Sequence, residues 1–302
     1  MPFDYINNLT TAFKNNIYSS STEIERKKEI IKLSITALSK KPERIVGFLR
    51  FQGVKQKLIQ FLTQSLEIKT GDMLEEFFTY LFGYQYTNLP KYIRGFKCDQ
   101  LFKKEENDTQ TIYLIEQKIR DDHDSSKKDG QVANFENKIN VIHSEYPNAH
   151  VVAYEWFIDD SFKKYPGYYK DKLDNFLAGK NGWLSGDVCY GGNLIDILCG
   201  DGSWQQFVES YNAVKMNYVS DIGTIIRDYD FDVDPDNVVF DYLKIKRDKS
   251  FKVFFDESYS EVRQALFPQG LLEKRLFNYF SNKNTITAHY FVSKYNEKHG
   301  GN

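Results

Sequence analysis

The sequence predicts an α/β protein in which a central mixed β-sheet is flanked by helices. A β-rich apolar run, Thr111–Ile115, is followed by a helical pattern that begins at Gly130 and has apolar residues at Val132, Phe135, Ile139 and Ile142. A second β-rich run follows over 148–158. Strand, helix and strand in that order favour two parallel strands joined by a crossover helix. Around this unit we expect a helical N-terminal region and a C-terminal hairpin followed by helices.

Length and composition limit the class of protein. The chain has 302 residues, of which 41% are hydrophobic, so it can bury one large core or two modest ones. A net charge of −2 argues against a protein that coats nucleic acid, but it allows a DNA enzyme with a local basic cleft. The three cysteines form no Cys-x-x-Cys motif, which indicates reduced thiols. With no signal-peptide pattern and no apolar run near ~20 residues, we expect a cytoplasmic protein that does not enter a membrane.

The periodicity divides the chain into three regions that we expect to pack as one compact unit. Residues 1–69 read as helical, with one long helix after Ser21-Thr22 and a second over 44–66. Residues 70–220 begin with a new helix capped at Thr70-Gly71-Asp72 and hold the sheet. Residues 221–302 contain two β-type runs, 238–246 and 250–257, and then two helices. We expect this last region to serve DNA recognition or dimerisation.

Acidic residues and a lysine lie where the first predicted strand ends. Glu116 and Lys118 are two apart, so on a strand they point the same way, roughly 7 Å apart at their Cα atoms. Gln117 points the other way, but its carbonyl oxygen can still reach a metal. If the run containing Asp99, at 95–102, pairs beside this strand across a polar turn over 103–108, Asp99 and Glu116 converge. Two carboxylates, a carbonyl and waters are ligands that Mg²⁺ prefers.

An acid-x-lysine pattern alone is a weak signal. The chain has three others, Glu25-Arg26-Lys27, Glu67-Ile68-Lys69 and Glu136-Asn137-Lys138, and all three lie in polar or helix-patterned sequence. Only Glu116-Gln117-Lys118 follows a β-rich apolar run and has a second candidate acid upstream. The residues alone leave open a solvated surface strand in place of a nuclease site.

Asp99 followed by Glu116-Gln117-Lys118 resembles the PD-(D/E)XK nuclease superfamily, although Cys98 stands where the family's proline would be. The continuation over 120–131, RDDHDSSKKDGQ, resembles type II restriction endonucleases of the HinfI group. This resemblance implies a restriction-endonuclease-like fold and Mg²⁺-dependent cleavage of double-stranded DNA at a short specific site, leaving 5′-phosphates. It implies that Asp99, Glu116 and Gln117 bind the metal and that Lys118 handles the water. A palindromic site would imply a homodimer.

Two further residues are suggested by the same resemblance. Glu75 lies at the border of the apolar stripe of a predicted helix, in a run, GDMLEE, that resembles the position of an extra active-site acid. It would bind metal, although an ordinary boundary glutamate reads the same. Gln131 resembles a glutamine that such nucleases carry on the helix after the catalytic strand, and we include it among the DNA contacts.

Polar segments that leave the proposed metal site are candidates for DNA binding. In the loop after Lys118, basic side chains suit phosphates, while Asp, Ser and His side chains can contact bases. A basic hairpin near the C-terminus can grip the backbone, although a charged edge hairpin that resists aggregation looks the same. The predicted contacts are Arg120, Asp122, His123, Ser125, Ser126, Lys127, Lys128, Lys244, Lys246 and Arg247.

Other classes of protein remain open from the sequence. The glycine-rich run over 182–202 lacks both the Gly-Lys-Ser/Thr and the GxGxxG patterns, so we expect no nucleotide cofactor. Within the same superfamily, a nuclease for repair or mobile-element work is an alternative. From a different class, a DNA-binding or scaffold protein could keep the fold without chemistry.

Overall fold

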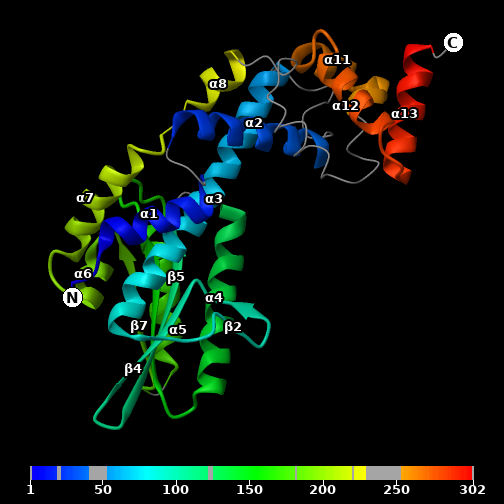
Figure 1. Cartoon of the computed structure of the whole chain (residues 1–302). Helices are drawn as coiled ribbons and strands as arrows, with labels where there is room; N and C mark the ends of the chain where they lie inside the picture. The colour runs from blue at the N-terminus through cyan, green and yellow to red at the C-terminus, as the bar shows by residue number, and fades with distance from the viewer. Residues whose placement is uncertain are drawn as a thin grey trace. The chain divides into compact units, whose positions relative to one another are not determined.

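The computed structural model describes residues 2–18, 22–40, 53–121, 125–180, 182–219, 221–228 and 253–300. The chain divides into two compact units (Figure 1). The first comprises Met1–Ile17 and Lys69–Met216, and the second comprises Tyr18–Ile68 and Asn217–Asn302. Within the described parts, no helix is both long enough and apolar enough to cross a bilayer.

A five-stranded mixed sheet forms the centre of the first unit. Its strand order is β1-β4-β5-β6-β7, with β4 antiparallel to β5 and with β5, β6 and β7 mutually parallel. The strands are β1 (Thr87–Asn88), β4 (Gln100–Glu106), β5 (Thr109–Lys118), β6 (His150–Phe157) and β7 (Leu184–Tyr190), with a separate ribbon of β2 (Tyr92–Ile93) and β3 (Phe96–Lys97). The predicted α/β class is confirmed.

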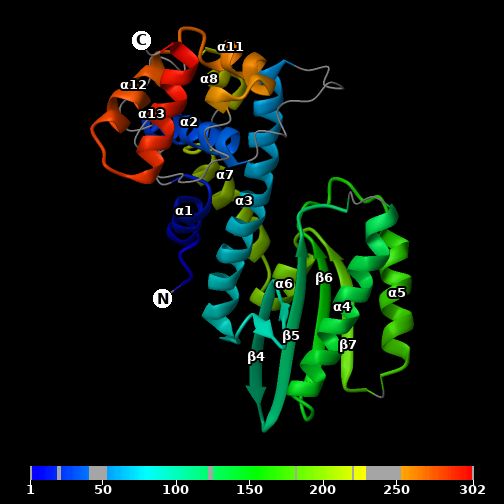
Figure 2. The same cartoon turned by 90° about the vertical axis from the view of Figure 1, so that its right-hand side faces the viewer.

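Helices cover both faces of this sheet. One face packs against α4 (Ser125–Glu145) and α5 (Pro166–Ala178); Figure 2 shows α4 in front of the strands and α5 to their right. On the other face, Phe78 of α3 (Val54–Gln85) packs edge-on against Trp156 of β6 at 4.7 Å between ring centroids. The helices α6 (Asn193–Cys199) and α7 (Ser203–Lys215) lie on that side too, and α1 (Tyr5–Asn16) packs on α7. The crossover β5-α4-β6 is the predicted strand–helix–strand unit.

The hairpin between β4 and β5 is tighter than predicted. Glu106 pairs with Thr109, which leaves only Asn107 and Asp108 in the turn, with φ values of 48° and 62°. Asn and Asp tolerate the left-handed conformation that a two-residue hairpin turn requires. The predicted polar turn over 103–108 is therefore mostly strand, and the short turn fixes the register that aligns the two strands.

Two predicted elements need correction, and one strand was not predicted. The cap expected at Thr70-Gly71-Asp72 is absent, since α3 runs unbroken from Val54 to Gln85. A single glycine costs a helix only about 1 kcal/mol, which the helix formers on either side outweigh. The helix expected from Gly130 begins at Ser125, so part of the predicted DNA-binding loop is helical. The strand β7 was missed, because Gly182 and Gly186 gave its segment the composition of a loop.

Helices make up the described part of the second unit. The predicted long helix is α2 (Glu23–Lys40), whose Arg26 donates to the carbonyl oxygen of Asn217 at 2.7 Å. The further helices are α8 (Ile222–Asp228), η2 (Glu257–Tyr259), α11 (Ser260–Leu266), α12 (Leu271–Ser281) and α13 (Ile286–His299). Three C-terminal helices thus replace the two predicted. Residues 41–52 and 229–252 lie outside the described residues, and of the predicted hairpin only 253–257 is described. There, 253–255 are helical rather than extended.

Candidate active site

Glu116 and Lys118 lie on the face of β5 that α4 covers. Alternate residues of β5 lie on this face. Ile112 and Leu114 are buried there and pack with α4 residues, and Glu116 and Lys118 follow at the C-terminal end of the strand. Gln117 points to the opposite face, where its side-chain oxygen accepts a hydrogen bond of 3.4 Å from Gln100. The predicted orientation of the three residues is therefore present in the fold.

Asp99 lies beside Glu116 across the β4–β5 hairpin. Gln100 pairs with Ile115, so Asp99, one residue earlier, lies next to Glu116 in the register. The carboxylate oxygen Oδ2 of Asp99 accepts a hydrogen bond of 2.8 Å from the backbone N–H of Gln117. The same oxygen is 3.8 Å from Nζ of Lys118, which in turn donates to Oε1 of Glu116 at 2.6 Å. The structure therefore brings together three of the four residues predicted to be catalytic, Asp99, Glu116 and Lys118.

A second lysine, Lys138 of α4, completes the group and was missed from the sequence. Its Nζ donates to Oε2 of Glu116 at 2.5 Å, and its side chain is only 7% exposed. The sequence did mark Lys138 as unusual. It lies three residues after Phe135 and four before Ile142, on the apolar stripe of its helix. A lysine on a buried stripe needs an acidic partner.

The two carboxyl groups have opposite electrostatic environments. Burial raises the pKa of Asp99, and the charge of Glu116 raises it further against the opposing charge of Lys118. Burial also opposes the charge of Glu116, but the charges and hydrogen bonds of Lys118 and Lys138 outweigh it and lower the pKa of that carboxyl. For Lys118, burial disfavours the ammonium form, yet the charges of Glu116 and Asp99 raise its pKa. Glu116 and Lys118 are thus both charged at neutral pH.

A third acid, Glu155, lies on the same face of the sheet. It pairs in register with Glu116 and is 2% exposed. Burial raises its pKa to about 7; the charge of Lys118 opposes this rise, and those of Glu116 and Asp121 add to it. Its sequence signal was an acid at the centre of the most apolar run of the chain.

The donor set fits a hard divalent cation. Asp99 and Glu116 present carboxylates side by side, and the repulsion that helps raise the pKa of Asp99 is one that a cation between them would relieve. Among the described residues, no three His, Cys, Asp or Glu side chains converge as a metal cluster. Asp99 and Glu116 would supply two carboxylates, which suits Mg²⁺, since Mg²⁺ keeps several waters and binds substrate phosphate.

Glu75 lies with other partners. Its carboxylate makes ion pairs with Lys91 at 2.8 Å and Lys97 at 3.0 Å, while its backbone oxygen accepts from Gln100. Lys97 links it electrostatically to Asp99: burial disfavours the charge of Lys97, but Glu75 and Asp99 together raise its pKa. The structure shows no direct bond between Glu75 and Glu116 in the part of the chain that it describes. The metal role of Glu75 stays a prediction.

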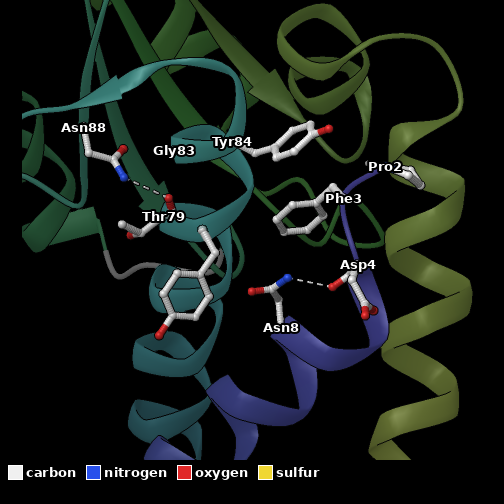
Figure 3. Close-up of a pocket in the computed structure, with 9 residues that line it drawn as sticks. Pro2, Phe3, Asp4, Asn8, Thr79, Gly83, Tyr84 and Asn88 are labelled. Atoms are coloured by element: carbon white, nitrogen blue, oxygen red, sulfur yellow. Dashed lines mark hydrogen bonds between the residues drawn. The ribbon is translucent and has the colours of Figure 1, made fainter.

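An open pocket of about 360 Å³ adjoins the catalytic strand. Glu116 and Lys118 form one wall, and Lys127, Gln131 and Asn134, which recur at helical spacing on α4, form another. The predicted contacts Lys127 and Gln131 therefore border the catalytic residues. A larger pocket of about 600 Å³, shown in Figure 3, contains none of the predicted site residues. It lies between the N-terminal segment and α3 and is lined by Phe3, Tyr84, Asn88 and their neighbours.

The other predicted DNA contacts are only partly described. Arg120 is exposed and pairs with Asp159 at 2.6 Å, and Lys128 lies over two tyrosine rings. These placements leave their role in DNA binding a prediction. Outside the described residues lie Asp122, His123, the side chains of Ser125 and Ser126, and Lys244, Lys246 and Arg247.

Two acids and a lysine, one acid just before β4 and the other two residues at the end of β5, form the arrangement expected from the resemblance to PD-(D/E)XK enzymes. Comparison with protein families matches residues 84–215 to the family described as "Type II restriction endonuclease, HinfI". The match covers less than half of the chain, and it shows that this segment is similar to type II restriction endonucleases of the HinfI family, which are DNA hydrolases. No match was found among curated proteins or solved structures. The matched segment contains Asp99, Glu116, Lys118, Lys138 and Glu155.

Proposed function

We propose that this protein is a Mg²⁺-dependent restriction endonuclease that cleaves both strands of DNA at a short palindromic site and leaves 5′-phosphates. The observation that supports this most is the convergence of Asp99, Glu116 and Lys118 on one face of the sheet, within the restriction-endonuclease domain. A surface strand would leave Glu116 and Lys118 solvated, whereas their side chains are only 14% and 18% exposed.

Each residue has a distinct part in the proposed reaction. Asp99 and Glu116 would hold Mg²⁺, which supplies Lewis-acid activation of the phosphate and of water. Lys138 fixes one oxygen of Glu116, and the backbone of Gln117 fixes one oxygen of Asp99, so both carboxylates are held in place before DNA arrives. Lys118 keeps its proton at neutral pH and neutralises charge that develops on the phosphate under attack.

Digestion of unmethylated phage DNA tests this proposal. The purified protein should give discrete fragments with Mg²⁺ and none with EDTA, and Lys118→Ala should cut at least about 100-fold more slowly, as for the loss of one electrostatic contact at a reacting centre. Lys104→Ala is the matched control, because Lys104 also pairs with a glutamate two residues away on the same sheet, but is 44% exposed.

Each result of that digestion has a defined meaning. Fragments from the Lys104→Ala control should equal those of the unaltered protein. A Mg²⁺-dependent smear would replace the restriction enzyme with a non-specific or structure-specific nuclease. Cleavage that survives in Lys118→Ala would contradict the assigned site.

A further inference from the structure

We propose that a lysine–tyrosine patch beside the catalytic pocket binds the phosphodiester backbone of double-stranded DNA without reading its sequence. This inference rests on the proposed function and adds to it a binding surface. The patch consists of Lys128, Lys163, Lys164, Lys172, Tyr165, Tyr168 and Tyr190.

The patch lies at the C-terminal edge of the three parallel strands. Lys163, Lys164 and Tyr165 follow the end of β6, and Tyr190 is the last residue of β7. Lys118, the catalytic lysine, is the last residue of β5. Ligands of open α/β sheets bind outside this edge, because the loops from neighbouring strands meet there.

Two features place the patch next to the catalytic pocket. Lys127 lines the pocket together with Glu116 and Lys118, and its neighbour in α4 is Lys128 of the patch. Gln131, also in the pocket, accepts a hydrogen bond of 3.5 Å from the hydroxyl of Tyr169, whose ring packs against Tyr168. DNA that places a phosphate at Glu116 and Lys118 would therefore extend over the patch.

Two of the three tyrosines, Tyr165 and Tyr190, are held in position by one buried carboxylate, whereas the hydroxyl of Tyr168 donates to Asp129. Asp121 is fully buried, and its Oδ2 accepts hydrogen bonds from the backbone N–H of Tyr165 at 2.7 Å and from the hydroxyl of Tyr190 at 3.2 Å. Its backbone oxygen accepts from the N–H of Lys164 at 3.2 Å. Asp121 thereby joins the loop after β6 to the ends of β5 and β7. These hydrogen bonds restrain Tyr165 and Tyr190, whose rings contact Lys128, Lys163 and Lys164.

The lysines lie over the aromatic rings. Lys128 Nζ is 4.3 Å from the ring centroid of Tyr165 and 4.0 Å from that of Tyr168. Lys163 lies 4.9 Å from the ring centroid of Tyr190, and Lys172 lies 5.6 Å from that of Tyr168. A cation–π contact restrains an ammonium group but leaves its charge intact. Each lysine can therefore meet a phosphate with its full charge.

The patch lysines differ from a nearby lysine, Lys170, in whether an acid neutralises their charge. Lys170, on the same helix as Lys172, pairs with Asp174 at 2.7 Å and Asp187 at 3.1 Å. By contrast, Lys128, Lys163 and Lys172 make no ion pair with any residue that the structure describes. In a chain of net charge −2, such unneutralised lysines give a local positive surface, which attracts the DNA backbone independently of sequence.

The test is the salt dependence of binding to two labelled duplexes of unrelated sequence. Binding would be measured by fluorescence anisotropy with Ca²⁺ in place of Mg²⁺, so that cleavage does not interfere. Lys163→Ala and Lys172→Ala should each weaken binding to both duplexes equally. The logarithm of the association constant falls linearly with the logarithm of the salt concentration. Each variant should reduce the steepness of that fall by about 1, the change expected when one phosphate contact is lost. Both lysines are exposed, so the variants should fold, as thermal melting would verify.

Lys170→Ala is the matched control and should leave the slope unchanged, since its charge is already neutralised. A slope in Lys163→Ala and Lys172→Ala equal to that of the control would overturn the patch. Weakening on one duplex alone would also overturn it, because the side chains would then be reading bases. The proposed nuclease activity is tested separately from the patch. It would be contradicted if the unaltered protein cut no DNA with Mg²⁺ while these binding results held.

Discussion

Glu116 holds its negative charge between two ammonium groups, one from its own strand and one from α4. Lys118 and Lys138 each bind a different carboxylate oxygen, at 2.6 and 2.5 Å. Removing one partner of a buried ion pair leaves the other charge uncompensated, which costs more than the pair itself contributes. Lys138 therefore positions Glu116 as well as stabilising the fold.

Lys138→Met should lower the free energy of unfolding by about 3 kcal/mol, the usual cost of breaking a buried ion pair from one side. Urea unfolding measures this loss. The double variant Lys138→Met/Glu116→Gln should lose less than the sum of the two single variants, because it removes both members of the Lys138–Glu116 pair together. Additive losses would show that Lys138 and Glu116 do not depend on each other.

Glu155 should make stability depend on pH. Its pKa is raised from 4.5 to about 7, so between these values the folded protein binds a proton that the unfolded chain has released. Stability from this group is therefore fully present below pH 4.5 and is lost as the pH rises through 7. Glu155→Gln removes this loss and should gain up to about 3 kcal/mol relative to the unaltered protein between pH 5 and pH 8.

Urea unfolding in EDTA at the two pH values measures the difference for Glu155→Gln. Glu209→Gln, which changes an exposed glutamate of α7, serves as the control and should follow the unaltered protein. An identical pH dependence in Glu155→Gln and in the unaltered protein would show that Glu155 does not hold a proton in the folded state.

Sequence patterns identified the residues that lie together in chain order, and missed those that arrive from other elements. Glu116 and Lys118 follow from the alternation of one strand, and Asp99 from the hairpin beside it. Lys138 and Glu155 join the site only through the packing of α4 and the register of β6. Each stood out as a charged residue in an apolar pattern, but the pattern did not specify its partner.

At the scale of the elements, the long periodic segments were predictable and the interrupted ones were not. α2, α4, β5 and β6 match their apolar patterns, although α4 starts five residues earlier than predicted, because Ser125 to Asp129 are polar and look like a loop. Gly186 of β7 and Gly182 just before it concealed a strand, and Gly71 of α3 suggested a break that the helix formers on either side outweigh.

Gly186 shows why β7 contains a glycine. A Cβ atom at this position would lie 2.1 Å from the backbone oxygen of Ala153 in β6, so Gly186→Ala must push the two strands apart. We expect it to destabilise the protein by more than about 2 kcal/mol in urea unfolding.

Gly167→Ala is the control for Gly186→Ala. On α5, a Cβ at Gly167 meets nothing within 4 Å, and alanine there should be neutral or stabilising by up to about 1 kcal/mol. Equal effects of the two substitutions would contradict the close approach of β7 to β6.

For the whole molecule, the modest net charge is compatible with DNA binding because positive charge is concentrated locally. The lysine–tyrosine patch lies at the same edge of the sheet as Glu116 and Lys118, while acids elsewhere offset its charge. We propose that the C-terminal region, 221–302, takes part in recognition or in a two-fold dimer, since one active site cuts one strand and two related sites cut both. Such a dimer would cut at a sequence with the same two-fold symmetry.

The most direct test of the central claim is to sequence the ends of the fragments that the protein produces from phage DNA with Mg²⁺. We expect every end to fall at one fixed position within a single short sequence that is identical on both strands. The ends should carry 5′-phosphates that ligase rejoins without further treatment. Ends at unrelated sequences, or ends that ligase cannot join, would contradict a site-specific endonuclease built on Asp99, Glu116 and Lys118.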